Sequence, residues 1–220
     1  MKAFIFDFDG VVLDTQQYWD MGTVELYRSF IPSWTEEDNA LLRGRSVVDI
    51  YHILADDYDI HISEQEYRKK TDTFALNIYR TKAQIIDGVL PLLDLLDARH
   101  VPHAIASSSQ KNWIEEALVR FQLTDRFASV STADEAGRGK PYPDVYLLAA
   151  KKLGVDPHEC VALEDTATGV RSAKAAGMTC IGFDPNPDSP IHLHADVVIG
   201  SLHEVTDGLL ETVIAKNSKS

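Results

Sequence analysis

The sequence predicts an α/β fold, a doubly wound parallel-sheet core of Rossmann-like type with an inserted α-helical cap domain. Short apolar runs that end in small or polar residues alternate with helical patterns, as expected of a parallel sheet covered by helices. Residues from about Gln16 to Lys82 break this alternation, because they contain helical patterns without a convincing strand. A chain of 220 residues is long enough for one core domain and a smaller insert.

The sheet is expected to form from apolar runs taken in chain order. These runs are Ala3–Phe6, Ala104–Ala106, Phe127–Val130, Val161–Leu163, Cys180–Phe183 and Val197–Ile199. Helical patterns lie between most of them, the clearest being Trp113–Phe121, Val145–Leu153 and Ala167–Ala176. This order of strands and helices predicts that the strands run parallel.

The block that breaks the alternation predicts the cap. Its clearest helical patterns are Arg43–Leu54 and Glu64–Tyr79, and hinges are expected near Thr15–Gln16 and Thr81–Asp87. The resulting division assigns residues 1–15 and 83–215 to the core, residues 16–82 to the cap and residues 216–220 to a flexible tail.

Composition and charge exclude several classes of partner. The net charge of −13 and a pI near 4.9 repel nucleic acid and anionic membrane surfaces. Cys160 and Cys180 lie in apolar stretches without disulfide spacing, and no run reaches the roughly 18 apolar residues of a membrane span. We therefore expect reduced cysteines, a cytoplasmic location, no membrane or nucleic-acid partner, and a monomer or weak dimer.

Polar clusters follow the ends of the expected strands. They are Asp7 and Asp9 with Gly10, then Ser107, Ser108 and Ser109, then Lys140, and finally Glu164 and Asp165. Ligands of open parallel sheets bind beyond the carboxyl ends of the strands, so the fold should bring these clusters to one edge. Each residue alone could be a turn or helix-capping residue, but all of them falling at strand ends favours a functional site.

The acidic members of this set predict a metal site. Carboxylates crowded into one volume raise one another's pKa values unless a cation is present. Ligands that are all oxygen select a hard divalent ion, and Mg²⁺ commonly takes one or two carboxylates together with substrate phosphate oxygens. Such an ion would also supply the local positive field that an anionic substrate needs on an acidic protein.

Four stretches then suggest a family. "DFDGVVLDT", "IASSS", "GKPYPD" and "LEDTATGV" have the order and spacing of the four motifs of the haloacid dehalogenase (HAD) superfamily. Together they resemble its β-phosphoglucomutase-like phosphatases, from Lys2 to about Phe183, and the helical insert lies where that branch carries its cap.

This resemblance implies a role for each strand-end residue. Asp7 would attack phosphorus and become an aspartyl phosphate, and Asp9 would protonate the leaving oxygen and then activate water. Ser107 and Lys140 would hold the phosphoryl oxygens. The implied Mg²⁺ ligands are Asp7, the Asp9 carbonyl, Asp165, and Glu164 directly or through water. The implied substrate contacts in the core are Gly10, Ser108 and Ser109.

The cap departs from the mutases of this branch. Trp19 stands where those mutases have a histidine, and the turn Gly44, Arg45, Ser46 is followed by Val47 where they have an arginine. We take Trp19, Gly44, Arg45 and Ser46 as candidate substrate contacts, with a packing role as the alternative for Trp19. The resulting hypothesis is a Mg²⁺-dependent phosphatase of a small phosphate ester such as a sugar phosphate. The alternatives are a phosphosugar mutase and a non-catalytic binding module.

Overall fold

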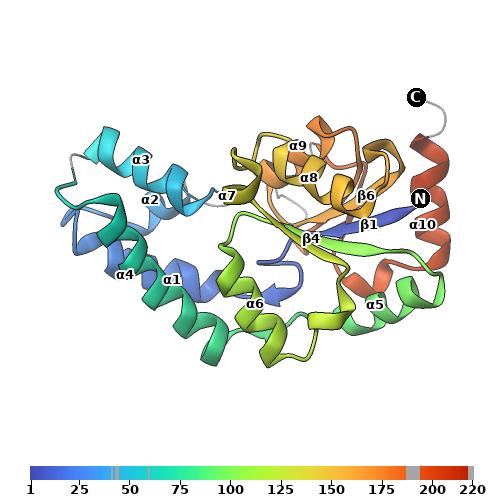
Figure 1. Cartoon of the computed structure of the whole chain (residues 1–220), viewed down its shortest axis with the longest axis horizontal. Helices are drawn as coiled ribbons and strands as arrows, with labels where there is room; N and C mark the ends of the chain where they lie inside the picture. Colours follow the sequence, from blue (N-terminus) through green and yellow to red (C-terminus); the bar gives the residue numbers. More distant parts are fainter. Residues whose placement is uncertain (41, 43–44, 59, 187–193, 218–220) are drawn as a thin grey trace.

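A parallel sheet forms the core of the computed structural model, which describes residues 1–40, 42, 45–58, 60–186 and 194–217 (Figure 1). Its strand order is β5-β4-β1-β6-β7-β8, and every neighbouring pair is parallel. The strands are β1 (Ala3–Phe6), β4 (His103–Ser107), β5 (Ser129–Thr132), β6 (Cys160–Glu164), β7 (Thr179–Phe183) and β8 (Val197–Ile199). The predicted fold class is confirmed, and each predicted strand is present.

Helices cover both faces of this sheet. Alternate strand residues point to opposite sides, and here both sets are apolar and must be buried. In β1, Phe4 and Phe6 join one apolar cluster, while Ala3 and Ile5 join a second. The first cluster includes residues of α5 (Val89–Ala98), α6 (Lys111–Arg120) and α10 (Asp207–Asn217). The second includes residues of α8 (Asp144–Leu153) and α9 (Ala167–Ala175). The shorter elements of the core are η2 (Thr124–Arg126), α7 (Ala133–Ala136), η3 (Pro157–Glu159) and η5 (Leu202–Glu204).

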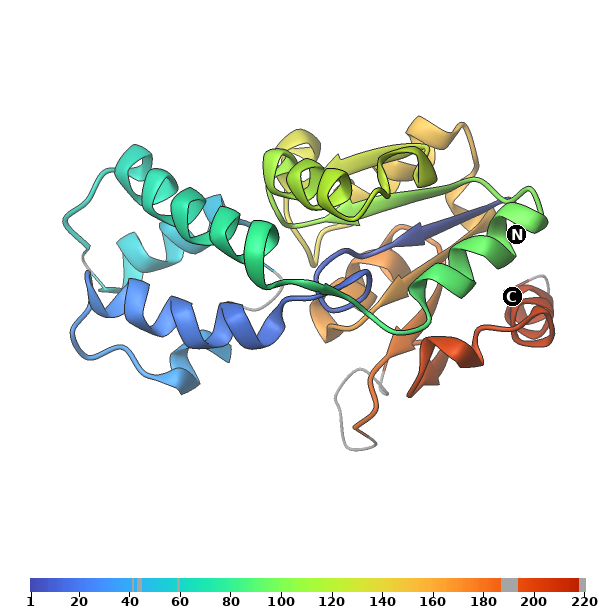
Figure 2. The same ribbon diagram turned by 90° about the horizontal axis from the view of Figure 1, so that it is seen from below.

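The cap is a separate helical lobe beside the core (Figures 1 and 2). It consists of α1 (Gln16–Arg28), α2 (Glu36–Ala40), α3 (Val47–Tyr58), α4 (Glu64–Asn77) and the π-helical turn η1 (Ile78–Lys82). The helix predicted from Arg43 begins at Val47 in the described residues, and the pattern Glu64–Tyr79 divides into α4 and η1. The exact domain boundaries stay a prediction.

A short ribbon joins the two crossings between cap and core. The strands β2 (Leu13–Asp14) and β3 (Gln84–Ile85) pair antiparallel, so the two connecting segments run side by side (Figure 2). The sequence predicts hinges here but no strand, because each strand has only two residues, too few for a periodic pattern. The ribbon fixes where the cap leaves the core and where it returns.

Helix α6 of the core packs against the cap. Trp113 Nε1 donates to Asp72 Oδ1 at 2.7 Å, and Arg80 pairs with Glu116 at 2.6 Å. Arg120 Nη1 donates to the Tyr79 carbonyl at 2.8 Å. These contacts hold α4 and η1 against the core.

Among the described residues, no helix is both long enough and apolar enough to cross a membrane.

Candidate active site

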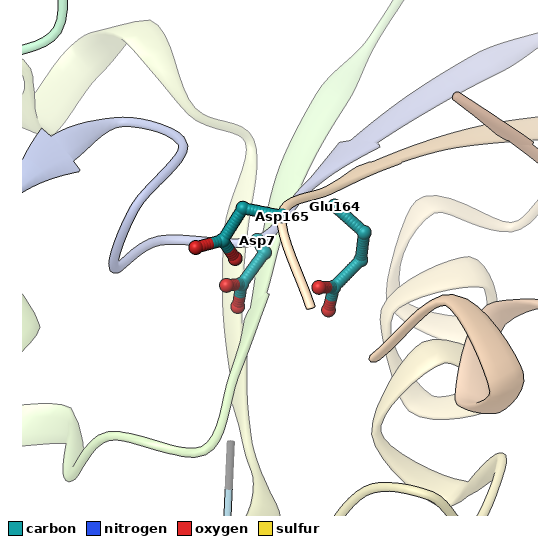
Figure 3. A group of neighbouring side chains, drawn as sticks. All are labelled: Asp7, Glu164 and Asp165. Atoms are coloured by element: carbon teal, nitrogen blue, oxygen red, sulfur yellow. The ribbon is translucent and has the colours of Figure 1, made fainter. Parts of the chain in front are cut away.

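Three acidic side chains converge at the carboxyl edge of the sheet (Figure 3). Asp7 follows β1, Glu164 ends β6, and Asp165 comes next in the chain. Strands β1 and β6 pair in register, with Phe6 opposite Leu163, so the residues that follow emerge together. One carboxylate oxygen from each of the three residues lies within 4.8 Å of the others. The structure thus brings together three of the four predicted strand-end carboxylates, and the Asp9 side chain is not part of this group.

Lys140 is buried against two of these carboxylates. Its Nζ donates to Asp7 Oδ1 at 2.6 Å and to Glu164 Oε1 at 2.5 Å. Burial alone would lower the pKa of Lys140. The negative charges of Asp7 and Glu164 raise it by more than burial lowers it, so the pKa lies above its usual value. The ammonium group therefore stays charged at neutral pH.

Asp7 has a strongly perturbed pKa. Burial and the charge of Glu164 raise the pKa of Asp7 to about 7, although Lys140 acts in the opposite direction. Only 6% of Asp7 is exposed, so water screens this repulsion little. A further positive charge at the site would favour the ionised carboxylate that attack on phosphorus requires.

Glu164 is already occupied by hydrogen bonds from several donors. Besides Lys140, its carboxylate accepts from Tyr146 OH at 2.8 Å, from Thr166 N at 3.2 Å and from Thr166 Oγ1 at 3.1 Å. Gly169 makes room for it, since a Cβ on that residue would lie 1.8 Å from Glu164 Oε1. Glu164 therefore orients Lys140, and these contacts favour a water-mediated link to any metal ion over a direct one.

Asp165 has the spare coordination capacity that Glu164 lacks. Its Oδ1 is buried and has no hydrogen-bond partner among the described residues. Burial, followed by the charges of Asp7 and Glu164, raises the pKa of Asp165. An unpartnered carboxylate oxygen beside a second carboxylate fits a hard divalent cation such as Mg²⁺.

Gly10 explains how Asp165 can come so close to the loop after β1. Its φ of +86° lies in the left-handed region, and a Cβ there would lie 1.9 Å from Asp165 Oδ2. The family resemblance implies a substrate contact for Gly10. The structure gives it this packing role, and a contact with substrate stays a prediction.

Three hydroxyl groups hold the Asp9 side chain. Thr15 Oγ1 and Tyr79 OH donate to Asp9 Oδ1, each at 2.7 Å, and Ser109 Oγ donates to Asp9 Oδ2 at 2.6 Å. The serines are also connected to each other, because the Ser109 amide donates to Ser107 Oγ at 3.0 Å. Asp9 is thus fixed beside the acidic cluster by groups from the first crossing, the cap and the loop after β4.

A cavity of about 130 Å³ lies between the site and the cap. The predicted residues that line it are Asp7, Asp9, Trp19, Arg45, Ser107, Ser108, Ser109 and Lys140. The other lining residues are Gln16, Asp20, Thr23, Tyr27, Asn39, Leu42, Val47, Ile50, Tyr67, Thr71, Trp113 and Thr166. Side chains of the core site and of the cap therefore face the same cavity.

The predicted cap contacts differ in where they lie. Trp19 lines the cavity and also packs edge-on against Phe74, with ring centroids 5.3 Å apart. It therefore has a packing role, and its contact with substrate stays a prediction. Ser46 instead caps α3, where its Oγ donates to Asp49 Oδ2 at 2.7 Å and accepts from the Asp49 amide. Gly44 lies outside the described residues.

Sequence reasoning missed four contributors to the site: Thr15, Tyr79, Tyr146 and Thr166. Tyr79 and Tyr146 occupy buried positions of helical patterns, where an aromatic ring is indistinguishable from ordinary core. Thr166 has the sequence signature of a helix cap, and its side chain does accept from the Gly169 amide at the start of α9. Its added bonds to Glu164 have no local sequence signal.

The model of the family described as haloacid dehalogenase-like hydrolase matches residues 4–183, which include every residue of the acidic cluster. The chain belongs to this family. It is 34% identical over 211 residues to hexitol phosphatase B of Escherichia coli (strain K12), which covers 93% of this chain and 94% of that protein. The predicted family and enzyme class are confirmed.

Two further comparisons agree with this assignment. The chain is 30% identical over 217 residues to the β-phosphoglucomutase of Bacillus subtilis (strain 168), covering 96% of this chain and 94% of that protein. The crystal structure of β-phosphoglucomutase from Clostridium difficile superimposes with a TM-score of 0.85 over the full length of both chains, at 23% identity. The latter likeness supports the fold, including the cap.

Proposed function

We propose that the protein is a Mg²⁺-dependent phosphatase that hydrolyses a small phosphorylated metabolite through an aspartyl phosphate on Asp7. The observation that carries this proposal is the buried contact between Asp7 and Lys140, which lies beside the unpartnered Asp165 oxygen and faces the cavity under the cap. A nucleophile, a fixed cation and an unpartnered carboxylate oxygen thus lie together at the edge of this cavity.

In the proposed first step, a carboxylate oxygen of Asp7 attacks phosphorus, and the bond from phosphorus to the leaving oxygen breaks. Lys140 balances negative charge on the transferring phosphoryl oxygens, and Ser107 donates to one of them. Asp7, Asp165 and the Asp9 carbonyl would hold Mg²⁺, with Glu164 reaching it through water. When bound, the ion neutralises the phosphate and favours the ionised form of Asp7.

Asp9 serves both halves of the reaction. It gives its proton to the leaving oxygen in the first step, and in the second it takes a proton from the water that hydrolyses the aspartyl phosphate. Phosphate leaves, and Asp7 and Asp9 return to their starting states. The hydroxyl groups around Asp9 support this role, because they hold its carboxyl group in one place.

The cavity supports a small, hydroxyl-bearing leaving group. Cap residues line it with polar side chains, among them Thr23, Tyr27 and Tyr67, together with the indole of Trp19. Such a wall can accept sugar or polyol hydroxyls. The similarity to hexitol phosphatase B favours the same substrate class.

A mutase remains the second candidate, since the chain is also 30% identical to a β-phosphoglucomutase. A mutase would transfer the phosphoryl group from Asp7 to a sugar hydroxyl instead of to water. Trp19 weighs against it, because a mutase of this branch is expected to have a histidine there. Retention of Asp7, Asp9, Lys140 and Asp165 weighs against a non-catalytic binding module.

One experiment separates these functions. Phosphate release is measured with Mg²⁺ on a panel of hexitol, aldose and ketose phosphates, and isomerisation of β-glucose 1-phosphate is measured in parallel. The phosphatase proposal predicts release from at least one sugar or polyol phosphate without isomerisation. Isomerisation faster than release would establish the mutase, and activity in neither assay nor on aryl phosphates would favour the binding module.

A further inference from the structure

Tyr79 belongs to the cap but lies at the reaction centre. It is the second residue of η1, the turn that ends the cap and leads back to the core. Its hydroxyl donates to Asp9 Oδ1 at 2.7 Å and lies 3.0 Å from Ser109 Oγ. π-Helical turns recur at functional sites, and here the turn carries a residue that contacts the proposed general acid.

The core holds Tyr79 rigidly in this position. The side chain is fully buried, and its ring stacks on Trp113 with centroids 6.3 Å apart and lies 6.1 Å from the ring of Phe8. Arg120 fixes its backbone, because Nη1 donates to the Tyr79 carbonyl at 2.8 Å. The hydroxyl therefore cannot swing away from Asp9 without unpacking the ring.

We infer that Tyr79 is a positioning residue that fixes the Asp9 carboxyl group for proton transfer to the leaving oxygen. This inference rests on the proposed function of Asp9. An acid must lie within hydrogen-bond reach of the oxygen that it protonates, and a displacement of about 1 Å can cost about 100-fold in rate. Thr15 shares Asp9 Oδ1 with Tyr79, so loss of the phenol leaves that oxygen held from one side only.

Two aryl esters that differ only in a para nitro group test this role. Phenol keeps its proton at neutral pH, with a pKa of about 10, so phenyl phosphate needs an acid, whereas p-nitrophenyl phosphate has a far better leaving group. In Tyr79→Phe, we expect the rate of the burst that releases the alcohol to fall about tenfold on phenyl phosphate and less than about threefold on p-nitrophenyl phosphate. We expect the ester concentration that half-saturates this burst to be unchanged, since the ring and the phosphate contacts remain.

A double-mutant cycle shows whether Tyr79 acts through Asp9. Once Asp9→Asn has removed the acid, adding Tyr79→Phe should cause no further loss on phenyl phosphate. Tyr51→Phe is the matched control, because it removes a phenol hydroxyl from the cap that donates to the Ile62 carbonyl at 3.1 Å, outside the cavity lining. It should leave the ratio of the two burst rates at that of the wild type.

The outcomes separate this inference from the proposed function. If wild type hydrolyses neither ester, or if Asp7→Asn retains turnover, the proposed function fails. If Asp9→Asn shows the expected leaving-group dependence but Tyr79→Phe lowers both burst rates equally, or adds its full loss to that of Asp9→Asn, the positioning role is wrong. Melting temperatures of all variants identify a loss that comes from unfolding.

Discussion

At the scale of single residues, the site depends on a division of work among three carboxyl groups. Glu164 is saturated with hydrogen bonds and fixes Lys140, Asp165 keeps an unpartnered oxygen, and Asp7 lies between them. Lys140 lowers the cost of burying Asp7, but it does not remove that cost, because burial and Glu164 still raise the Asp7 pKa to about 7. In the apoprotein, the surroundings of Asp7 therefore disfavour the ionised form of its carboxyl group.

Replacing Asp7 should for this reason stabilise the apoprotein. In the unfolded chain Asp7 loses its proton near pH 4, and in the folded protein near pH 7, so its contribution to the free energy of unfolding falls as pH rises between these values. Asp7→Asn has no such proton. In EDTA at pH 8, the melting temperature of Asp7→Asn should exceed that of wild type. The difference should be about 2–4 °C for each kcal/mol by which the substitution raises the free energy of unfolding, and it should be small at pH 4. An equal difference at both pH values would contradict this cause.

Asp9→Asn should reveal a different defect. Loss of the acid and base should lower kcat on phenyl phosphate by roughly 10²–10⁴-fold, and by much less on p-nitrophenyl phosphate in the step that releases the alcohol. Burst kinetics separate that step from hydrolysis of the phosphoenzyme. Equal losses in the first step on both esters would assign Asp9 to metal binding or folding instead.

At the scale of elements, the cap completes a cavity that the core only begins. The β2–β3 ribbon sets both crossings side by side, and α6 holds α4 and η1 through Trp113, Glu116 and Arg120. The proposed phosphate chemistry uses residues at strand ends, whereas the cap side of the cavity is formed largely by α1, with further residues of α3 and α4. The proposed function therefore predicts that specificity and chemistry belong to different elements.

Arg45 tests this separation, because it lines the cavity just before α3. Arg45→Ala should raise KM about 10-fold or more for the best substrate of the sugar phosphate panel, since a contact with the leaving group is lost. It should leave kcat/KM for p-nitrophenyl phosphate within about twofold. Lys69→Ala, an exposed change on α4 outside this cavity, is the control. An equal fall on both substrates would place Arg45 in folding or phosphate binding.

At the scale of the whole molecule, the sequence was sufficient to predict the strands of the sheet and most of the polar residues that follow them. Buried parallel strands leave continuous apolar runs, and the polar residues that follow them stand out. The β2–β3 ribbon was not predictable, because each strand has two residues. Nor was the contact between Tyr79 and Asp9, which lie 70 residues apart. A buried tyrosine looks like core until the tertiary partner of its hydroxyl is known.

The charge of the whole molecule predicts dependence on a metal ion. A net charge of −13 and a cluster of three carboxylates repel a phosphate dianion, and Lys140 already has two carboxylate partners. Excess EDTA should therefore lower phosphatase activity at least about 100-fold, and Mg²⁺ should restore it and raise the melting temperature. Asp165→Asn should weaken both effects of Mg²⁺. Full turnover in EDTA would contradict the metal site.

Chemical trapping shows whether Asp7 carries the phosphoryl group. The protein is mixed with p-nitrophenyl phosphate and Mg²⁺, quenched during turnover and treated with borohydride, which reduces an aspartyl phosphate to homoserine. Peptide mass spectrometry should then find homoserine at position 7 in wild type, more of it in Asp9→Asn if hydrolysis of the intermediate is slowed, and none in Asp7→Asn. Turnover with homoserine at another aspartate, or with no reduced residue in either wild type or Asp9→Asn, would contradict the account.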